Sequence, residues 1–235
     1  MAEELTRMKI LLGEEWVAKL AKKTVLVAGV GGVGSFVTEA LARSGIGKLI
    51  LIDSDEVEIS NLNRQLMTNY DNVGLPKVEV MKQRIASYSR TTEVETRQLF
   101  IDDSFEIGEK VDYVADCIDT LSGKMALAEK AYAAGIPLIS AMGAARRITT
   151  GELIVTTLDK TSGDPLARNY RQLCRKRGFD AKNIRVVINT SPTLEYDPPA
   201  KEEHKRTPLG SSIFPVGILG LKIAEIIVND LLEIR

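Results

Sequence analysis

A glycine-rich turn near the N-terminus has the composition of a phosphate-binding loop. It follows the apolar, β-branched residues 24–28, precedes a helical apolar pattern, and reads Gly29-Val30-Gly31-Gly32-Val33-Gly34. Glycines let the backbone of such a turn approach a phosphate, and the N–H groups and dipole of the following helix stabilise its charge. Asp53 ends the next apolar run, where its carboxylate can accept hydrogen bonds from ribose hydroxyls. These residues predict an adenine-nucleotide site, but they do not choose between NAD and ATP.

Two cations and an amide further along the chain favour a triphosphate over a nicotinamide dinucleotide. Asn61 and Arg64 are three residues apart in the stretch SNLNRQ, so in a helical turn they share one face. Lys77 comes near the predicted start of the next helix. Such groups stabilise the negative charge that develops when a triphosphate loses pyrophosphate. A surface salt-bridge cluster is the alternative interpretation for either cation taken alone.

A third polar group follows the apolar residues 111–115 and reads Asp116-Cys117-Ile118-Asp119-Thr120. Asp119 is expected to project past the strand end toward the nucleotide, where a carboxylate can hold Mg²⁺ between phosphate oxygens. Thr120 is included in the same predicted nucleotide site. Asp119 has an alternative interpretation as the N-cap of the next helix. Cys117 is interpreted as a small buried hydrophobic residue.

Alternating apolar patterns predict the framework that positions these residues. We expect helices over 36–45, 76–87 and 122–134, and strands over 24–28, 48–52, 94–97, 111–115 and 137–140. Short buried strands that alternate with helices are typical of a parallel sheet, whose ligand sites lie at the carboxyl ends of the strands. The predicted fold class is α/β, with a Rossmann-like, mostly parallel sheet and helices on both faces.

The pattern changes after about residue 145, where an antiparallel extension of the sheet is expected. Its predicted elements are a strand over 153–158, a basic helix over 164–177, a strand over 185–189, a loop over 191–212 that contains His204, and a buried apolar helix from Ile213. We expect one domain over residues 1–235. Its halves are a nucleotide-binding part, 1–145, and a part for substrate and dimer contacts, 146–235.

Composition narrows the class of protein. The 235 residues carry a formal net charge of -1, from 31 Lys and Arg against 32 Asp and Glu, and 44% are hydrophobic, so disordered and fibrous classes are excluded. Two cysteines and one histidine exclude a disulfide framework and a four-ligand zinc site built from them. The uncharged stretch 211–221 is too short to span a bilayer, and no secretory peptide is visible. A cytoplasmic location is therefore expected.

Basic residues of the second half are concentrated in one predicted helix. Asp164 and Pro165 indicate its start and Gly178 its end. The cations that we expect to contact nucleic acid are Arg168, Arg171, Arg175 and Lys176. In an otherwise neutral chain this local excess favours a phosphate backbone as the partner. An ordinary solvated helix face is the alternative.

As a set, GxGGxG, Asp53, SNLNRQ, Lys77 and DCID resemble the ubiquitin-activating-enzyme-like adenylyltransferases, which include MoeB and ThiF, over residues 5–145. The resemblance implies ATP and Mg²⁺ as cofactors and a carboxylate that is activated as an acyl-adenylate. It assigns the ribose to Asp53, the phosphates to Asn61, Arg64 and Lys77, and Mg²⁺ to Asp119. It also implies a homodimer in which Arg7 reaches the phosphates bound by the partner protomer.

The second half distinguishes between branches of that superfamily. Activators of ubiquitin-like or sulfur-carrier proteins usually have zinc-binding CxxC pairs or a catalytic cysteine in a crossover loop, and this chain departs from both patterns. Residues 143–145, 159–168 and 210–219 instead resemble the tRNA threonylcarbamoyladenosine dehydratases. Those enzymes use ATP to cyclise the threonylcarbamoyl group on the adenosine beside the tRNA anticodon. A nitrogen of the same side chain attacks the adenylate, and an effective molarity of roughly 10⁵ M or more makes an enzyme nucleophile unnecessary.

The expected function is therefore ATP-dependent adenylation of a carboxylate by a homodimeric dehydratase that acts on tRNA. Three alternatives stay open at this point. The chain could activate the C-terminal carboxylate of a ubiquitin-like or sulfur-carrier protein, or it could be a nucleotide-sensing scaffold without catalysis. A dehydrogenase is the most distant of the three.

Overall fold

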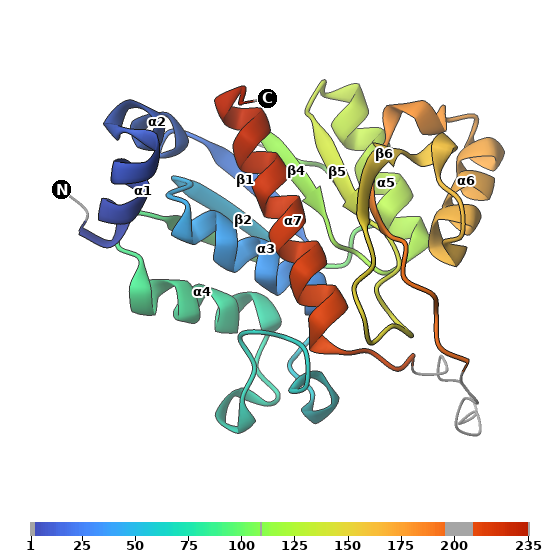
Figure 1. Ribbon diagram of the computed structural model, residues 1–235, viewed down its shortest axis with the longest axis horizontal. Coiled ribbons are helices and arrows are strands. Elements are labelled where there is room, and N and C mark those ends of the chain that lie inside the picture. Colours follow the sequence, from blue (N-terminus) through green and yellow to red (C-terminus); the bar gives the residue numbers. More distant parts are fainter. Residues whose placement is uncertain (1–2, 109, 196–208, 235) are drawn as a thin grey trace.

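The computed structural model is built around one central β-sheet (Figure 1). It describes residues 3–108, 110–195 and 209–234. Within these residues seven strands are ordered β3-β2-β1-β4-β5-β7-β6, all parallel to their neighbours except β6, which is antiparallel to β7. The strands are β1 (Thr24–Ala28), β2 (Lys48–Ile52), β3 (Glu93–Arg97), β4 (Tyr113–Asp116), β5 (Leu138–Ala141), β6 (Leu153–Thr157) and β7 (Arg185–Asn189). The predicted α/β fold with an antiparallel extension is confirmed.

Helices cover both faces of this sheet, as Figure 1 shows for α7 in front of it. They are α1 (Thr6–Leu12), α2 (Glu14–Leu20), α3 (Gly32–Arg43), α4 (Lys77–Tyr88), α5 (Leu121–Ala133), α6 (Pro165–Arg177) and α7 (Ile213–Leu232). Among the described helices, none combines the length and the apolar character that crossing a bilayer requires.

The alternation of side chains along β1 divides the core between the two faces. Val25 and Val27 belong to the cluster that contains residues of α3, α4 and α7, whereas Leu26 and Ala28 belong to a cluster with residues of α5. All four side chains are fully buried. A central parallel strand with helices on both sides must be apolar at every position, which is why the run TVLVA shows no polar alternation.

Helix ends in the second half follow local sequence signals. The Asp164 carboxylate accepts a hydrogen bond from the Ala167 amide at 2.9 Å and starts α6, and Gly178 ends it in the left-handed conformation, with φ of 70°. The predicted helix over 164–177 is thus confirmed to within one residue. The predicted loop over 191–212 is described only at 191–195 and 209–212, so its remainder, including His204, lies outside the described residues.

Candidate active site

The turn between β1 and α3 accepts only glycine at two of its positions. Gly29 has φ of 84°, and a Cβ there would lie 2.7 Å from the Cys117 carbonyl oxygen. A Cβ on Gly34 would lie 1.8 Å from the Gly29 carbonyl oxygen. The turn is therefore packed tightly against the residue that follows β4, and α3 begins within it, at Gly32.

A cavity of about 640 Å³ lies at the carboxyl ends of the parallel strands. Its size falls in the range of ligand sites, roughly 300–1,000 Å³. The predicted site residues in its wall are Gly29, Gly31, Gly32, Asp53, Asn61, Arg64, Lys77, Asp119 and Thr120. Two predicted residues are absent from the wall: Gly34 packs beneath the turn, and Arg7 is exposed on α1. The fold thus brings together nine residues from five separate segments of the first half.

Asp53 ties the end of β2 to the glycine turn. Its carboxylate accepts hydrogen bonds from the backbone amide of Val30, at 2.6 Å, and of Asp55, at 2.9 Å. Burial raises the pKa of Asp53 above its ordinary value, although the nearby Lys77 charge and the two amide bonds act in the opposite direction. Asp53 is thus half-buried at the edge of the cavity, and its carboxylate is oriented by two backbone amides.

Lys77 is the most deeply placed cation of the cavity wall. It begins α4, is only 6% exposed, and its Nζ lies 2.7 Å from the Asp55 carboxylate. Arg64 is half-buried and donates through Nη1 to the Ser60 carbonyl oxygen at 2.8 Å. Lys77 does form a salt bridge, as the alternative interpretation of the sequence proposed. However, Lys77 is buried in the cavity wall and is not part of a surface cluster.

Asn61 has a structural task that the sequence pattern did not indicate. Its Oδ1 accepts a hydrogen bond from the Glu58 amide at 3.0 Å, which closes a capping box around the short 3-10 helix Ile59–Asn61. The residue is 5% exposed. Asn61 and Arg64 face the same cavity because the Arg64 amide bonds back to the Asn61 carbonyl oxygen at 3.1 Å.

Asp119 and Thr120 leave oxygen atoms available at the opposite wall. Thr120, and not Asp119, is the N-cap residue of α5, and its side chain makes no capping bond. Its buried Oγ1 has no hydrogen-bond partner among the described residues. Asp119 is exposed and lines the cavity. Its side chain forms no hydrogen bond or ion pair with the described residues.

The donor set tests whether Mg²⁺ fits this wall. No group of three or more His, Cys, Asp or Glu residues that could hold a metal ion occurs within the described residues. A divalent ion here would have one protein carboxylate, that of Asp119, and would take its other ligands from phosphate oxygens and water. Mg²⁺ is commonly held in this way, by one or two carboxylates and a nucleotide, so the residues fit an ion that arrives with its triphosphate.

Residues from the end of the first half and from the second half line the cavity without having been predicted as part of the site. Gly143, Ala144, Ala145 and Leu166 line the cavity, the last from the first turn of α6. The Asp164 carboxylate accepts a hydrogen bond from the Gly143 amide at 3.0 Å, which joins α6 to the end of β5. Gln65 also lines the cavity, and the quoted motif SNLNRQ was the signal that could have identified it.

Neither cysteine is suited to nucleophilic catalysis. Burial raises the pKa of Cys117 to about 12 and that of Cys174 to about 11. A thiol attacks as the thiolate, which is scarce at neutral pH when the pKa is this high. Covalent thioester chemistry at either residue is therefore disfavoured by the geometry of the fold.

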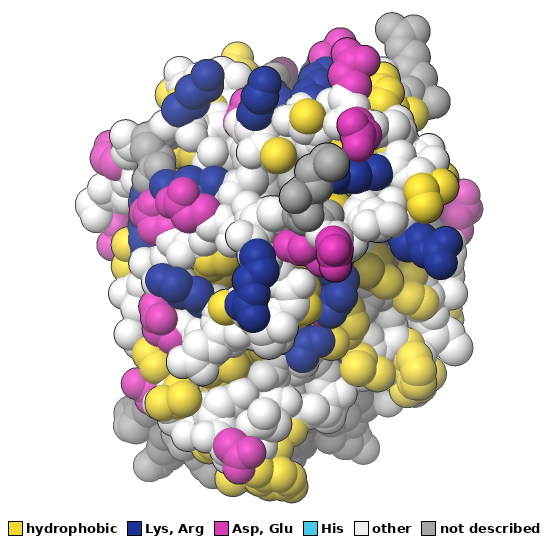
Figure 2. All heavy atoms as spheres, turned by 90° about the vertical axis from the view of Figure 1, so that its left-hand side faces the viewer, with side chains coloured by type: hydrophobic (Ala, Val, Ile, Leu, Met, Phe, Trp, Pro, Cys, Tyr) yellow, Lys and Arg dark blue, Asp and Glu magenta, His cyan; other side chains and the backbone are white. Residues whose placement is uncertain are grey.

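Three of the four predicted nucleic-acid cations remain available on α6. Arg171 is turned inward and donates to Thr161 Oγ1, within its own half of the chain. The others are exposed and form no ion pair within the described residues; we call Arg168, Arg175 and Lys176 the α6 basic face. Figure 2 shows the side of the molecule that carries α1 and α2, where basic and acidic side chains are interspersed; α6 lies at the other end of Figure 1.

The sequence and the fold are similar to those of known proteins. The sequence model of the ThiF family matches residues 4–228. A tRNA threonylcarbamoyladenosine dehydratase of Bacillus subtilis (strain 168) is 36% identical over 247 residues, which cover 99% of this chain and 96% of that protein. One from Escherichia coli (strain K12) is 41% identical over 170 residues, covering 69% of this chain and 62% of that protein. The crystal structure of the E. coli enzyme with ATP has a TM-score of 0.86 at 30% identity and covers 98% of this chain and 94% of that one.

Proposed function

The chain belongs to the ThiF family, and we propose that it acts within that family as an ATP-dependent tRNA threonylcarbamoyladenosine dehydratase. One observation carries the proposal. A single cavity is lined by the phosphate-loop, ribose and cation residues and by Gly143–Ala145 of the first half, and by Leu166, Leu209 and Ser211 of the second. The similarity to the B. subtilis dehydratase extends over both halves.

In the proposed reaction, the carboxylate of the threonylcarbamoyl side chain attacks the α-phosphorus of ATP. The bond to the β-phosphate oxygen breaks, pyrophosphate leaves, and an acyl-adenylate forms. A nitrogen of the same side chain then attacks the acyl carbon, loses its proton, and expels AMP as the ring closes. The nucleoside loses the elements of water, and ATP is converted to AMP and pyrophosphate.

The residues of the cavity divide this work. The Asp53 carboxylate accepts hydrogen bonds from the ribose hydroxyls, and the first backbone amides of α3 donate to phosphate oxygens. Lys77 and Arg64 stabilise the negative charge of the leaving pyrophosphate. Asp119 would hold Mg²⁺, which supplies further neutralisation of the phosphate charge. The two thiols, whose pKa values are raised, take no part, because the adenylate is consumed within one substrate molecule.

Tests with tRNA and with carrier proteins separate this function from its alternatives. The protein is incubated with ATP, Mg²⁺, labelled pyrophosphate and either tRNA that carries threonylcarbamoyladenosine or candidate sulfur-carrier proteins. In the presence of tRNA we expect the label to pass from pyrophosphate into ATP, and mass spectrometry to detect conversion of the nucleoside to its cyclic form. Arg64→Ala should lose both activities. Exchange that requires a carrier protein and ignores tRNA would overturn the assignment. ATP binding without AMP release under any condition would indicate a scaffold.

The proposed tRNA partner fits the α6 basic face, which continues from Leu166 in the cavity wall along the outside of one helix. Phosphates of the anticodon region would contact these cations while the modified nucleotide enters the cavity. A tRNA substrate of this kind also fits the expected cytoplasmic location.

We further propose a homodimer. Phe214, Ile218 and Leu221 of α7 recur at helical spacing and are 59%, 45% and 51% exposed, and Ile10 and Leu11 of α1 are more exposed still. An apolar surface of this kind is typical of a protein–protein contact. Arg7, which lies outside its own cavity wall, would act on the partner's site. Mixing Arg7→Ala with Lys77→Met protomers, each inactive alone, should then restore part of the activity, and no restoration would contradict the assignment of Arg7.

A further inference from the structure

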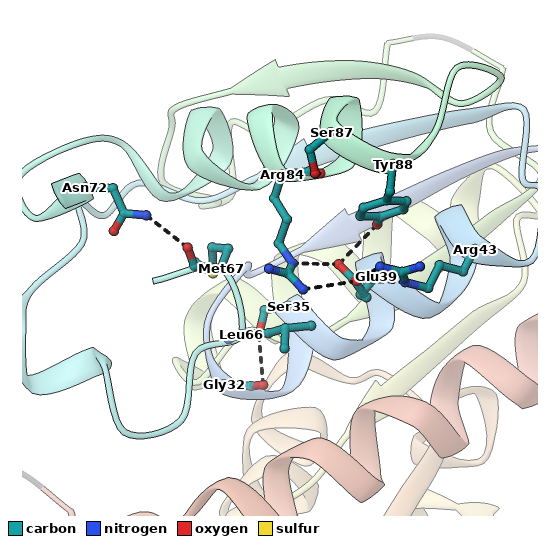
Figure 3. Close-up of polar contacts among 10 residues, drawn as sticks. All are labelled: Gly32, Ser35, Glu39, Arg43, Leu66, Met67, Asn72, Arg84, Ser87 and Tyr88. Carbon is teal, nitrogen blue, oxygen red and sulfur yellow. Dashed lines mark hydrogen bonds and ion pairs between the residues drawn. The ribbon is translucent and has the colours of Figure 1, made fainter. Parts of the chain in front are cut away.

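The carboxylate of Glu39 in α3 is shared by donors from two helices (Figure 3). Arg84 of α4 donates through Nε to Oε2 at 2.8 Å and through Nη2 to Oε1 at 3.2 Å. The Tyr88 hydroxyl, also on α4, donates to Oε2 at 3.1 Å. Arg43 of α3 itself donates to Oε1 at 2.8 Å. Glu39 is 8% exposed, so its charge is compensated almost entirely by these three side chains.

This contact lies at the same depth below the cavity in both helices. Glu39 is seven residues from Gly32, the first residue of α3, and Arg84 is seven residues from Lys77, the first residue of α4. Seven residues make about two turns, roughly 10 Å of helix. The bidentate bond therefore joins the helix that begins in the glycine turn to the helix that begins with the buried cation.

A second polar contact on the same face of α3 holds the remaining phosphate-binding segment. Ser35 precedes Glu39 by one turn, donates to the Gly32 carbonyl oxygen at 3.2 Å, and accepts a hydrogen bond from the Leu66 amide at 3.2 Å. Leu66 follows Arg64 by two residues. The close-up in Figure 3 shows Ser35 and Glu39 along one side of α3, facing this segment and α4 respectively.

We propose that Glu39 and Arg84 are positioning residues that hold Lys77 at a set distance from the glycine turn, so that ATP meets a preorganised cation. Apolar packing of α4 on the core, through Val78 and Met81, is not directional and does not by itself fix the orientation of the helix. A directional bidentate bond removes that freedom, because both of its N–H groups must keep their geometry. The inference rests on the proposed ATP-dependent function, and it assigns no contact with substrate to either residue.

Arg84→Met and Arg43→Met form a matched pair of variants. Each removes one guanidinium from Glu39, but Arg84 lies on α4 and joins that helix to the carboxylate, whereas Arg43 lies on α3 with Glu39 and only stacks on the Tyr88 ring of α4. We expect Arg84→Met to lower kcat/KM for ATP–pyrophosphate exchange about 10- to 100-fold, the order of loss that a displacement of about 1 Å causes. Arg43→Met should stay within about twofold of the parent protein, since the ion pair that it breaks lies within α3 and the hydrogen bonds of Arg84 and Tyr88 from α4 to Glu39 remain. Equal losses in the two variants would overturn the proposal.

A double-mutant cycle with Lys77→Met separates positioning from general destabilisation. ATP affinity is measured by calorimetry for the parent, Arg84→Met, Lys77→Met and the double variant. If Arg84 acts through Lys77, its removal weakens ATP binding about tenfold in the parent and less than about twofold when Lys77 is already absent. A full tenfold loss in both backgrounds would refute the proposal.

Tyr88→Phe keeps the cycle interpretable if Arg84→Met does not fold. It removes one hydrogen bond between α4 and Glu39 and preserves the ring, so a smaller loss with the same dependence on Lys77 is expected. No dependence on Lys77 would refute the proposal as well. The calorimetric readout needs no tRNA: a parent that binds ATP but converts no tRNA contradicts the proposed function alone, whereas unchanged ATP affinity in the variants contradicts the positioning role alone.

Discussion

Replacement of Lys77 by methionine separates the catalytic role of a buried cation from its structural one. The Lys77 side chain is 7% exposed in the cavity wall, whereas the side chain of its ion-pair partner Asp55 is 64% exposed. Methionine preserves most of the length and apolar volume of the lysine side chain. The variant therefore removes a charge while disturbing the packing of α4 very little.

The expected magnitudes differ for the two roles. An ion pair with one well-solvated partner contributes about 0–1 kcal/mol to stability, because water screens it. In a chain of this size that shifts the melting temperature by about 4 °C or less. A fixed cation that stabilises the developing charge of a transition state contributes about 2.7–4 kcal/mol, or 10²- to 10³-fold in kcat. Lys77→Met should therefore melt close to the parent protein and lose 100- to 1,000-fold in ATP–pyrophosphate exchange.

Asp55→Asn is the matched control, because it breaks the same ion pair and leaves the ammonium group in place. Both variants are assayed for exchange at saturating tRNA and for melting by calorimetry. Asp55→Asn should exchange pyrophosphate at least as fast as the parent, since the phosphates no longer compete with a carboxylate for Lys77. The reasoning is refuted if Asp55→Asn loses as much activity as Lys77→Met, or if Lys77→Met retains more than about a tenth of the parent rate.

Three further predictions concern other parts of the site. Asp119→Asn should abolish Mg²⁺-dependent exchange without lowering the melting temperature, because Asp119 is exposed and its side chain makes no hydrogen bond to the described residues; a markedly lower melting temperature would indicate a structural role. Alanine at all three positions of the α6 basic face should reduce the salt dependence of tRNA binding by up to about 3 in log–log slope and leave ATP affinity unchanged; an unchanged slope would place tRNA elsewhere. ATP affinity should fall as the pH falls through the raised pKa of Asp53, because the protonated carboxyl group accepts fewer hydrogen bonds, and the midpoint should lie above the ordinary value of about 3.9. In Lys77→Met the midpoint should move higher, because the Lys77 charge lowers the pKa of Asp53. Calorimetry over a pH series that finds a midpoint at or below about 3.9 would contradict this prediction.

Elements with strong local signals were predictable almost to the residue. The strand over 24–28 is β1 without change, and the helix over 164–177 is α6, which begins at Pro165. The strand predicted over 111–115 is shifted, since β4 runs from Tyr113 to Asp116. Asp112 precedes the strand, and its carboxylate accepts a hydrogen bond from the Thr24 amide and another from Lys23 Nζ. These two bonds connect the segment before β4 to the start of β1.

The positions of side chains at the cavity were predictable where the backbone alone sets the place of the residue. The glycine turn, Asp53 at the end of β2 and Lys77 at the start of α4 reach one cavity because strand ends and helix starts in a parallel sheet meet at one edge. The direction of Arg171 was not predictable, since Thr161 lies on a different element and draws the guanidinium inward. The alternative interpretation of Asp119 as an N-cap is wrong, because α5 begins one residue later than that interpretation requires and its N-cap residue is Thr120.

The sequence by itself determined the order of strands and helices, the phosphate-binding turn and the class of chemistry, because caps, apolar periods and glycine turns act over a few neighbouring residues. Only the tertiary structure decided which distant side chains meet. Glu39 receives bonds from residues 45 and 49 positions away in the chain, and Leu166, Leu209 and Ser211 line the cavity from the other half. Such contacts depend on how helices pack across the sheet, and no periodicity within one segment contains that information.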